Sequence, residues 1–284
     1  MSVVVGYDGS QVAGQAVRFA AQEAQGRGVA LEVVTAWDAP TVDLGMGSGA
    51  VVDPQLTEAV AQRAGEVAAE GADLAGAVEV VSTALPGPAA AALVERSRDA
   101  DLVVIGSLGR HGMADLLLGG VARQVAAHAA SPVIVVRRAE PRFQRIVVGI
   151  DGSEAAQRAL DFAFEQASRR NWALRVVHAW DVPVIGFDAD TSTYPHGGII
   201  DDVRDAETRL SAEVLAGHID RYPDVDLEVT VRRGGAAKVL VDESGDSDLL
   251  VTGSRGRGGF SALLLGSVSH KVLHHAQCNI AIVH

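Results

Sequence analysis

Residues 249–271 read LLVTGSRGRGGFSALLLGSVSHK, and this stretch decides the fold. Its apolar start, Leu249–Thr252, predicts a buried strand, and its end predicts a helix over Ser267–His275. The loop between them is rich in glycine and arginine. Glycine lets a ligand approach the backbone closely, and a helix N-terminus carries about half a positive charge. With Arg255 and Arg257 nearby, the stretch predicts an anion site, most simply for phosphate.

A glycine-rich connection also has an ordinary explanation, because turns need glycine and arginine is common on protein surfaces. The chain, however, contains the stretch twice. Residues 102–121 read LVVIGSLGRHGMADLLLGGV, and both copies show glycine, two residues, glycine, nine residues, glycine. The duplication therefore favours an anion site over a glycine-rich turn that binds no ligand. The three glycines are Gly106, Gly109 and Gly119 in the first copy and Gly253, Gly256 and Gly266 in the second.

The duplication extends over the whole chain. Residues 4–10 read VVGYDGS and residues 147–153 read VVGIDGS, and the tripeptide Ala-Trp-Asp begins at both Ala36 and Ala179. Corresponding residues lie 143 positions apart at the first motif and 147 apart at the glycine loop, which is a net insertion of four residues in the second copy. We therefore predict two tandem domains, 1–138 and 143–284.

On these motifs both halves resemble universal stress protein domains, and the whole chain resembles a tandem member of that family's ATP-binding subgroup. The strongest mark is the second copy's Gly253, Gly256, Gly266 and Ser267, the pattern with which the family binds ATP. The resemblance implies that strand ends, glycine loop and helix start hold the nucleotide in each copy, and that Ala36 and Ala179 meet the adenine through their backbone. The implied positions are Gly6, Asp8, Ala36, Gly106, Ser107, Gly109, Arg110, Gly112, Gly119, Gly120 and Val121, then Gly149, Asp151, Ala179, Gly253, Ser254, Arg255, Gly256, Arg257, Gly258, Gly266, Ser267, Val268 and Ser269.

Apolar runs alternate with helical patterns in both copies, which predicts an α/β fold with a parallel sheet covered on both faces. The resemblance implies two tandem Rossmann-like domains of the adenine nucleotide alpha hydrolase type. It also implies a five-stranded sheet of order 3-2-1-4-5 in each domain and an antiparallel meeting of the two fifth strands. The predicted strands are 3–7, 31–36, 78–84, 102–105 and 132–136, then 145–150, 174–179, 227–231, 249–252 and 279–283. The predicted helices are 11–26, 54–76, 88–98 and 121–128, then 154–169, 201–222, 236–244 and 267–275, with a glycine-rich loop over 41–53.

Asp8 and Asp151 each end the first strand of their copy, before a Gly-Ser turn. Two interpretations stay open. The carboxylate can stabilise its own turn and the following helix start, or it can hydrogen-bond the ribose or base of a nucleotide, as the resemblance implies. A phosphoryl-accepting role is disfavoured, because a receiver domain needs further acidic residues and a lysine at the end of its last strand.

Gly120 is the informative departure from the family pattern, which has Ser or Thr there, as Ser267 is in the second copy. A hydroxyl at that helix start can reach a phosphate oxygen. Its loss costs about 1.5–3 kcal/mol if it bonded a charged group, or about tenfold or more in affinity. We predict weaker nucleotide binding in the first domain, not its absence.

Composition excludes several classes of function. A formal charge of −12 disfavours nucleic-acid binding, because duplex phosphates would be repelled. One cysteine, Cys278, allows no disulfide within the chain. The start, MSVVVGYDGS, lacks the basic region of a signal peptide, and no apolar run is long enough for a membrane helix. We expect a cytoplasmic protein that does not bind membranes.

The leading hypothesis is an ATP-binding stress-response protein, with Mg²⁺ bridging the phosphates. No residue stands out as a general base or as a clamp for phosphoryl transfer, so we expect a binding or regulatory role with slow hydrolysis at most. The alternatives are an ATPase or nucleotidyl transferase of the same fold, and a ligand-independent interaction module. His270 and His274 have a metal-compatible spacing but no acidic or sulfur partner, so no protein metal site is predicted. A homodimer is possible in addition to the internal pair.

Overall fold

The computed structural model describes residues 2–39, 41–42, 51–109, 118–181, 208, 214–257 and 264–284. Its internal contacts divide the chain into two compact units. Unit 1 comprises Met1–Pro141 with Leu273–Ile282 and His284, and unit 2 comprises Arg142–Val272 with Val283.

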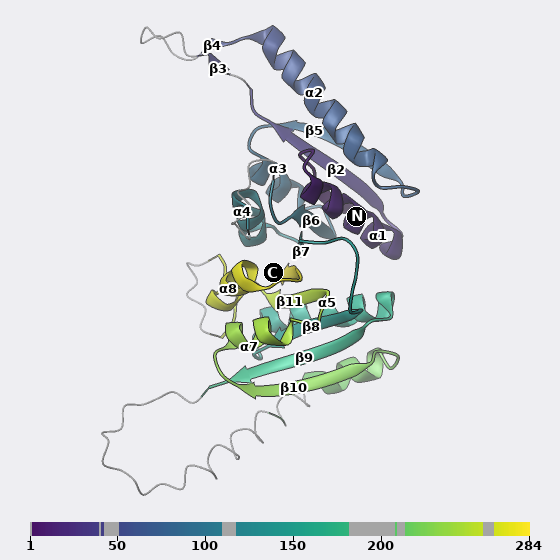
Figure 1. Cartoon of the computed structure of the whole chain (residues 1–284), viewed down its shortest axis with the longest axis vertical. Coiled ribbons are helices and arrows are strands. Elements are labelled where there is room, and N and C mark those ends of the chain that lie inside the picture. Colours follow the sequence, from purple (N-terminus) through teal and green to yellow (C-terminus); the bar gives the residue numbers. More distant parts are fainter. Residues whose placement is uncertain are drawn as a thin grey trace, which may run out of the picture. The chain divides into compact units, whose positions relative to one another are not determined.

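Unit 1 contains a parallel sheet whose strand order is β5-β2-β1-β6-β7 (Figure 1). In chain order this is 3-2-1-4-5, as the resemblance implied. Val3, Val4 and Val5 of the central strand are at most 1% exposed. Because successive side chains of a strand point to opposite faces, both faces of the sheet are covered. The strands are β1 Ser2–Gly6, β2 Ala30–Trp37, β5 Val80–Pro86, β6 Leu102–Gly106 and β7 Val133–Val136.

Four helices of unit 1 connect and cover these strands. Helix α1 (Gln11–Arg27) is capped by Ser10, whose hydroxyl accepts a hydrogen bond from the Ala13 N–H at 3.2 Å. Asp53 caps α2 (Pro54–Asp73) in the same way, through the N–H groups of the first turn. Helix α1 contacts α2, and α3 (Ala89–Arg96) contacts α4 (Gly120–His128).

The predicted loop over residues 41–53 was only partly right. Its ends pair as two short antiparallel strands, β3 (Thr41–Val42) and β4 (Val51–Val52). Two-residue strands are too short to show an alternating pattern, so the sequence gives no signal for them. Residues 43–50 lie outside the described part of the chain.

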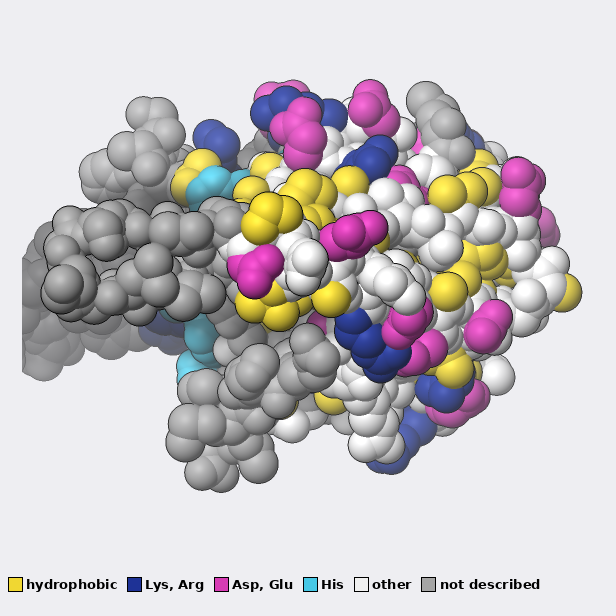
Figure 2. Space-filling model, turned by 90° about the horizontal axis from the view of Figure 1, so that it is seen from above, with side chains coloured by type: hydrophobic (Ala, Val, Ile, Leu, Met, Phe, Trp, Pro, Cys, Tyr) yellow, Lys and Arg dark blue, Asp and Glu magenta, His cyan; other side chains and the backbone are white. Residues whose placement is uncertain are grey.

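Helix α2 presents a charged outer side. Arg63 Nη1 lies 3.0 Å from Glu66 Oε2 and 3.1 Å from Glu70 Oε1, and at least half of each side chain is exposed. On the face that Figure 2 shows, acidic and basic side chains likewise lie beside one another among hydrophobic ones. Exposed ion pairs stabilise a fold by at most about 1 kcal/mol. The helix is therefore held mainly by its buried side, Ala64, Val67, Ala68 and Gly71.

Unit 2 repeats the arrangement, with strand order β10-β9-β8-β11 in a parallel sheet. Ser153 caps α5 (Glu154–Arg170) as Ser10 caps α1. Most of the helix predicted over 201–222 lies outside the described residues, but 214–221 are helical and Leu215 is buried. The other elements are β8 Arg145–Ile150, β9 Ala173–Trp180, β10 Leu227–Arg233, β11 Leu249–Gly253, α7 Ala236–Glu243 and α8 Ser267–His275.

The last strand of the chain, β12 (Asn279–Val283), pairs antiparallel with β7, with Ala281 opposite Ile134. This confirms the implied antiparallel meeting of the two fifth strands. The side chain of Asn279 strengthens the junction. Its Oδ1 accepts hydrogen bonds from the N–H groups of Arg137 (2.8 Å) and Arg138 (3.1 Å), and its Nδ2 donates to the Arg138 carbonyl (2.9 Å).

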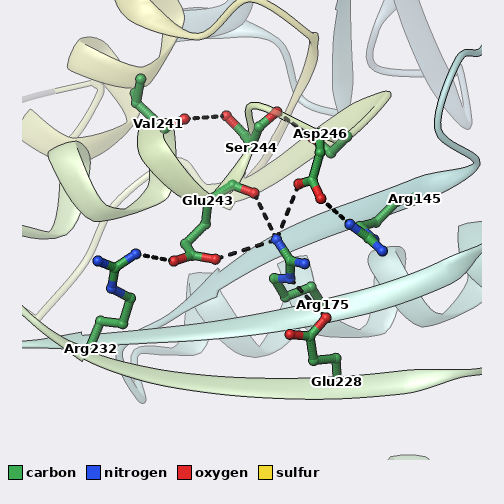
Figure 3. Close-up of polar contacts among 9 residues, drawn as sticks. Arg145, Arg175, Glu228, Arg232, Val241, Glu243, Ser244 and Asp246 are labelled. Atoms are coloured by element: carbon green, nitrogen blue, oxygen red, sulfur yellow. Dashed lines mark hydrogen bonds and ion pairs between the residues drawn. The ribbon is translucent and has the colours of Figure 1, made fainter.

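A charge network ties the sheet of unit 2 to the end of α7 (Figure 3). At its centre Arg175 lies 3.0 Å from Glu228, 3.3 Å from Glu243 and 3.2 Å from Asp246. Arg145 and Arg232 complete it by pairing with Asp246 and Glu243. Arg175 and Glu243 are each only 13% exposed, so the pair between them is the best shielded from solvent.

Unit 1 has an ion pair at the corresponding positions with the charges reversed. Glu32 stands where Arg175 stands in the second copy, and Arg96 stands where Glu243 stands. Arg96 Nε lies 3.5 Å from Glu32 Oε1, which also accepts a hydrogen bond from Thr83 Oγ1 at 3.0 Å. The contact has thus been kept in both copies while the two residue types have been exchanged.

Candidate functional site

A cavity of about 640 Å³ opens at the carboxyl ends of β8, β9 and β11 in unit 2. Ligands of parallel α/β folds bind at this end of the sheet. The cavity walls are the three strand ends, the glycine loop, the start of α8 and the first residues of α7. Its lining residues are Gly149, Ile150, Asp151, Ala156, His178, Ala179, Trp180, Asp181, Ala236, Leu240, Thr252, Gly253, Arg255, Gly256, Arg257, Gly266, Ser267, Val268 and Ser269.

Asp151 joins the end of β8 to the glycine loop. Its Oδ1 accepts a hydrogen bond from the Ser153 N–H at 2.9 Å, and its Oδ2 accepts one from the Arg257 N–H at 3.1 Å. Asp8 makes the same local bond to the Ser10 N–H, at 3.0 Å. The turn-stabilising interpretation is therefore confirmed for both residues, and the nucleotide-binding interpretation stays a prediction.

Two glycines of the loop are required by the loop itself. A Cβ atom at Gly256 would collide with Oδ2 of Asp151, and one at Gly266 would lie 3.3 Å from the Cα of Arg255. The loop backbone also folds back on itself, because the Gly266 N–H donates to the Ser254 carbonyl at 2.7 Å. A side chain at Gly256 would thus collide with Asp151 and one at Gly266 would crowd the Arg255 backbone, so at these two positions the loop presents its backbone to the cavity.

Two other glycines of the site serve packing. A Cβ atom at Gly253 would come within 2.7 Å of the Ala155 backbone in α5, and one at Gly149 within 2.7 Å of Leu240 in α7. Gly106 meets Val12 of α1, and Gly6 meets Leu93 of α3, in the same manner. These four glycines allow helices to approach the strand ends closely, so their presence is explained without a ligand.

The start of α8 faces the cavity with unused backbone donors. The first N–H groups of an α-helix have no partner within the helix, and here they belong to Ser267, Val268 and Ser269, which all line the cavity. The Ser269 hydroxyl is already engaged, because it donates to the Gly253 carbonyl at 2.6 Å. Ser267 is exposed at the mouth. The geometry suits an acceptor-rich anion at this helix end.

The charged groups of the mouth come from the same loop. Arg255 and Arg257 are both exposed, and the guanidinium of Arg257 lies over the Asp-Gly-Ser turn, 2.7 Å from where a Cβ at Gly152 would be. Among the residues that the structure describes, no three His, Cys, Asp or Glu side chains gather as a metal-binding group.

Unit 1 contains a smaller cavity, of about 350 Å³, at the corresponding strand ends. Its walls are again the strand ends, the glycine loop and the helix start, here of α4. Its lining residues are Gly6, Tyr7, Asp8, Ala13, Val34, Ala36, Ala89, Leu93, Ile105, Gly106, Ser107, Leu108, Gly109, Leu118, Gly119, Gly120, Val121 and Ala122.

Comparison with known proteins agrees with this architecture. The model of the universal stress protein family matches residues 1–137 and again residues 142–284. The chain belongs to the universal stress protein family. The universal stress protein Rv2623 of Mycobacterium tuberculosis is 34% identical over 291 residues, covering 99% of this chain and 96% of its own length. The universal stress protein Mb2028c of Mycobacterium bovis is 36% identical over 295 residues, with the same two coverages.

A solved universal stress protein from Archaeoglobus fulgidus has a similar fold. It superposes with a TM-score of 0.68 over 99% of this chain and 95% of its own, at 19% sequence identity. At that identity the likeness concerns the fold. The tandem arrangement and the Rossmann-like α/β architecture of this family member are therefore shared with known members.

The structure gathers most of the predicted site residues of this universal stress protein around its two cavities. In unit 1 all described members of the predicted set line the smaller cavity, and in unit 2 all but Ser254 line the larger one. Ser254 is buried beside it, where its N–H donates to the Val283 carbonyl at 2.7 Å. Arg110, Gly112 and Gly258 lie outside the described residues.

Eight lining residues of the larger cavity were not predicted as ligand contacts, among them His178, Thr252 and Trp180. His178 is buried, with its Nδ1 3.0 Å from the Ile150 carbonyl oxygen. Thr252 and Trp180 are 3% and 7% exposed, and within the described structure Thr252 Oγ1 and Trp180 Nε1 have no hydrogen-bond partner. His178, Thr252 and Trp180 all lie at strand ends next to predicted site residues. This position in the sequence could have identified them as lining residues.

Proposed function

We propose that the second domain, residues 143–284, binds ATP in the larger cavity, as a nucleotide-dependent regulator in stress response. The observation that carries the proposal is the convergence, in one cavity, of the α8 N-terminus, the backbone of the loop glycines Gly256 and Gly266, and Arg255 and Arg257. Backbone N–H groups, a helix dipole and two guanidinium groups together favour a multiply charged anion.

The remaining walls suit the nucleoside part of such a ligand. Ala179 and Gly149 bring backbone to the cavity with little side chain in the way, and Ala156, Ala236 and Leu240 supply apolar surface. Thr252 Oγ1 and Trp180 Nε1 offer polar groups that a ligand can satisfy. A mostly apolar pocket with a few placed polar groups is the usual form of a small-molecule site.

The residues also fit Mg²⁺ carried by the nucleotide. Mg²⁺ keeps several waters and commonly uses only one or two carboxylates besides phosphate oxygens, and Asp151 and Asp181 line the cavity. When bound, the ion would neutralise part of the phosphate charge. Oδ1 and Oδ2 of Asp151 already accept hydrogen bonds from the protein, so Asp151 is first a scaffold for the loop.

A binding role is favoured over catalysis. The cavity wall contains no lysine, and its one histidine, His178, is buried with Nδ1 beside a backbone carbonyl. Phosphoryl transfer needs a positioned nucleophile and clamps that act in the transition state. We propose slow hydrolysis at most. In the described residues no helix is long and apolar enough to span a membrane.

The proposal is tested by thermal unfolding with and without Mg·ATP, on the wild type and on Gly266→Asp. A ligand at 100 times its dissociation constant adds about 2.7 kcal/mol, a shift of several degrees in a protein of this size. The variant places a negative side chain where a Cβ would lie 3.3 Å from the Arg255 Cα, so its shift should be much smaller. No shift of the wild type with ATP, ADP or AMP would favour the interaction-module alternative.

Turnover distinguishes the enzyme alternative. Release of phosphate from ATP is followed in the same samples, with the wild type and Asp151→Asn compared. A rate below about one turnover per minute, equal in the wild type and the variant, agrees with a regulator, since typical enzymes turn over about ten times per second. Rapid multiple turnovers that depend on Asp151 would support an ATPase.

A further inference from the structure

The two cavities differ in chemistry although their glycine loops share one pattern. Residues 147 positions apart correspond in the two loops, as Gly106 and Gly253 do. At four such lining positions a polar or charged residue of the larger cavity is replaced by an apolar one or by glycine in the smaller cavity. The pairs are Arg255 and Leu108, Thr252 and Ile105, Ser267 and Gly120, and Ser269 and Ala122.

Packing does not force the differences at the cavity mouths. Gly120 is exposed, and a Cβ atom there would meet nothing within 4 Å. Leu108 is half-buried and Arg255 is exposed, both at the start of the loop. A serine would therefore fit at Gly120, yet the chain has none there. The difference concerns what each mouth presents to a ligand.

The cavity interiors differ in the same direction. The Thr252 hydroxyl is 3% exposed and has no hydrogen-bond partner in the described structure. An unpartnered buried hydroxyl is destabilising unless a ligand satisfies it. The corresponding residue, Ile105, is 6% exposed and has no side-chain polar group that needs a hydrogen-bond partner. At this position the larger cavity offers a ligand a hydroxyl group and the smaller cavity an apolar side chain.

Charge separates the two sites further. In the described lining of the smaller cavity Asp8 is the one acidic or basic residue, whereas Arg255 and Arg257 accompany Asp151 and Asp181 in the larger cavity. Arg110 lies outside the described residues, but it corresponds to Arg257, so it does not distinguish the copies. The carboxylate of Asp8 repels a triphosphate, and the smaller cavity has Leu108 instead of an arginine at the position that corresponds to Arg255. An uncharged ligand is not repelled. The smaller volume, about 350 Å³ against 640 Å³, agrees.

We propose that the two domains bind different ligands, ATP in the second and an uncharged adenine nucleoside, of the adenosine class, in the first. The proposal rests on the proposed function for its adenine part, because the strand-end residues Gly6, Asp8 and Ala36 repeat Gly149, Asp151 and Ala179. The protein would then respond to the nucleoside and the triphosphate at separate sites.

Equilibrium dialysis of the full chain with labelled adenosine tests the proposal. In excess unlabelled Mg·ATP the wild type should still bind one adenosine per chain, with a dissociation constant changed by less than about threefold, because the sites are separate. In Arg255→Leu/Ser267→Gly, ATP binding should weaken about tenfold or more, while adenosine binding stays as in the wild type.

The exchange variant Leu108→Arg/Gly120→Ser tests the cause. The variant gives the mouth of the first cavity the two side chains found at the mouth of the second. ATP should therefore compete with adenosine there, at an ATP concentration about tenfold or more below the one needed in the wild type. Gly120 has room for a side chain, and an unchanged thermal unfolding midpoint without ligand shows that the variant folds.

The possible failures are distinguishable. Two equivalent ATP sites per chain that exclude adenosine would overturn this proposal and leave the proposed function standing. Complete displacement of adenosine by ATP at one shared site would also overturn this proposal and leave the proposed function standing. Binding of neither compound would overturn both. An exchange variant that folds but binds ATP and adenosine as the wild type does would show that these two residues do not set the preference.

Discussion

The Oδ2 atom of Asp151 accepts a hydrogen bond at 3.1 Å from the backbone N–H of Arg257, 106 residues further along the chain. The same carboxylate holds the turn after β8 through the Ser153 N–H. One side chain thus fixes both the first strand end and the glycine loop at the cavity. The shape of the site is therefore set by the protein before any ligand binds.

Asp151→Asn should loosen the loop. The amide keeps one acceptor oxygen but places an N–H₂ group opposite one of the two backbone donors, so a charge-assisted bond worth about 1.5–3 kcal/mol is lost. We expect unfolding in denaturant to report a loss of about 1–2 kcal/mol. Asp181→Asn, at an exposed lining position, is the matched control and should change stability by less than about 0.5 kcal/mol. Equal effects of the two variants would contradict this role.

Gly256→Ala should act through Asp151, because the new Cβ collides with Oδ2. Either the carboxylate or the loop must move, so we expect a stability loss of about 1–3 kcal/mol and weaker ATP binding in the same dialysis assay. Gly217→Ala is the control, since a Cβ in that described helical segment meets nothing within 4 Å. It should be neutral or stabilising by up to about 1 kcal/mol. A neutral Gly256→Ala would show that the loop tolerates a side chain.

The charge network of unit 2 should depend on its central residue. Arg175→Met keeps the length of the side chain but leaves Glu243, only 13% exposed, with a single cationic partner. We expect a loss of about 1–3 kcal/mol in the free energy of unfolding. Arg232→Met removes a guanidinium that is 53% exposed from the same carboxylate, and it should cost less than about 1 kcal/mol. The reverse order would contradict the assigned roles.

Tyr7 gives a dependence on alkaline pH. Burial raises the pKa of its phenol above the ordinary value, and the nearby carboxylates of Glu70 and Asp8 raise it further while Arg18 opposes them. The folded state therefore prefers the neutral phenol. Its contribution to stability is fully present below the ordinary pKa of about 10 and is lost as the pH rises through the raised value.

We expect ultraviolet titration of tyrosinate to show a late-ionising group in the wild type that is absent from Tyr7→Phe. Unfolding measured over the same pH range should show a steeper loss of stability in the wild type than in the variant. Parallel stability curves would indicate that Tyr7 ionises equally in the folded and unfolded chain.

The parts of this protein that could be predicted from sequence are those with a local signal. Apolar runs placed the strands, and repeated glycines located the loops. The reasons for individual glycines could not be predicted from the local sequence. A side chain at Gly253, for example, would collide with the backbone of Ala155 in α5. Long-range packing of this kind leaves no trace in the local pattern.

The charge reversal shows the same limit. Glu32 and Arg96 lie far apart in sequence, as do Arg175 and Glu243, and only the folded sheet and helix bring each pair together. Thr252 likewise reads as one more strand residue until its buried hydroxyl is seen to line the cavity without a partner among the described residues.

The most direct test of the central claim is equilibrium dialysis of the full chain against labelled Mg·ATP. We predict saturable binding that weakens about tenfold or more in Arg255→Leu/Ser267→Gly. Arg232→Leu, which removes the same charge at a position outside the cavity lining, should bind as the wild type does. No saturable binding to the wild type, or equal binding by all three proteins, would contradict the assignment of an ATP site to the second domain.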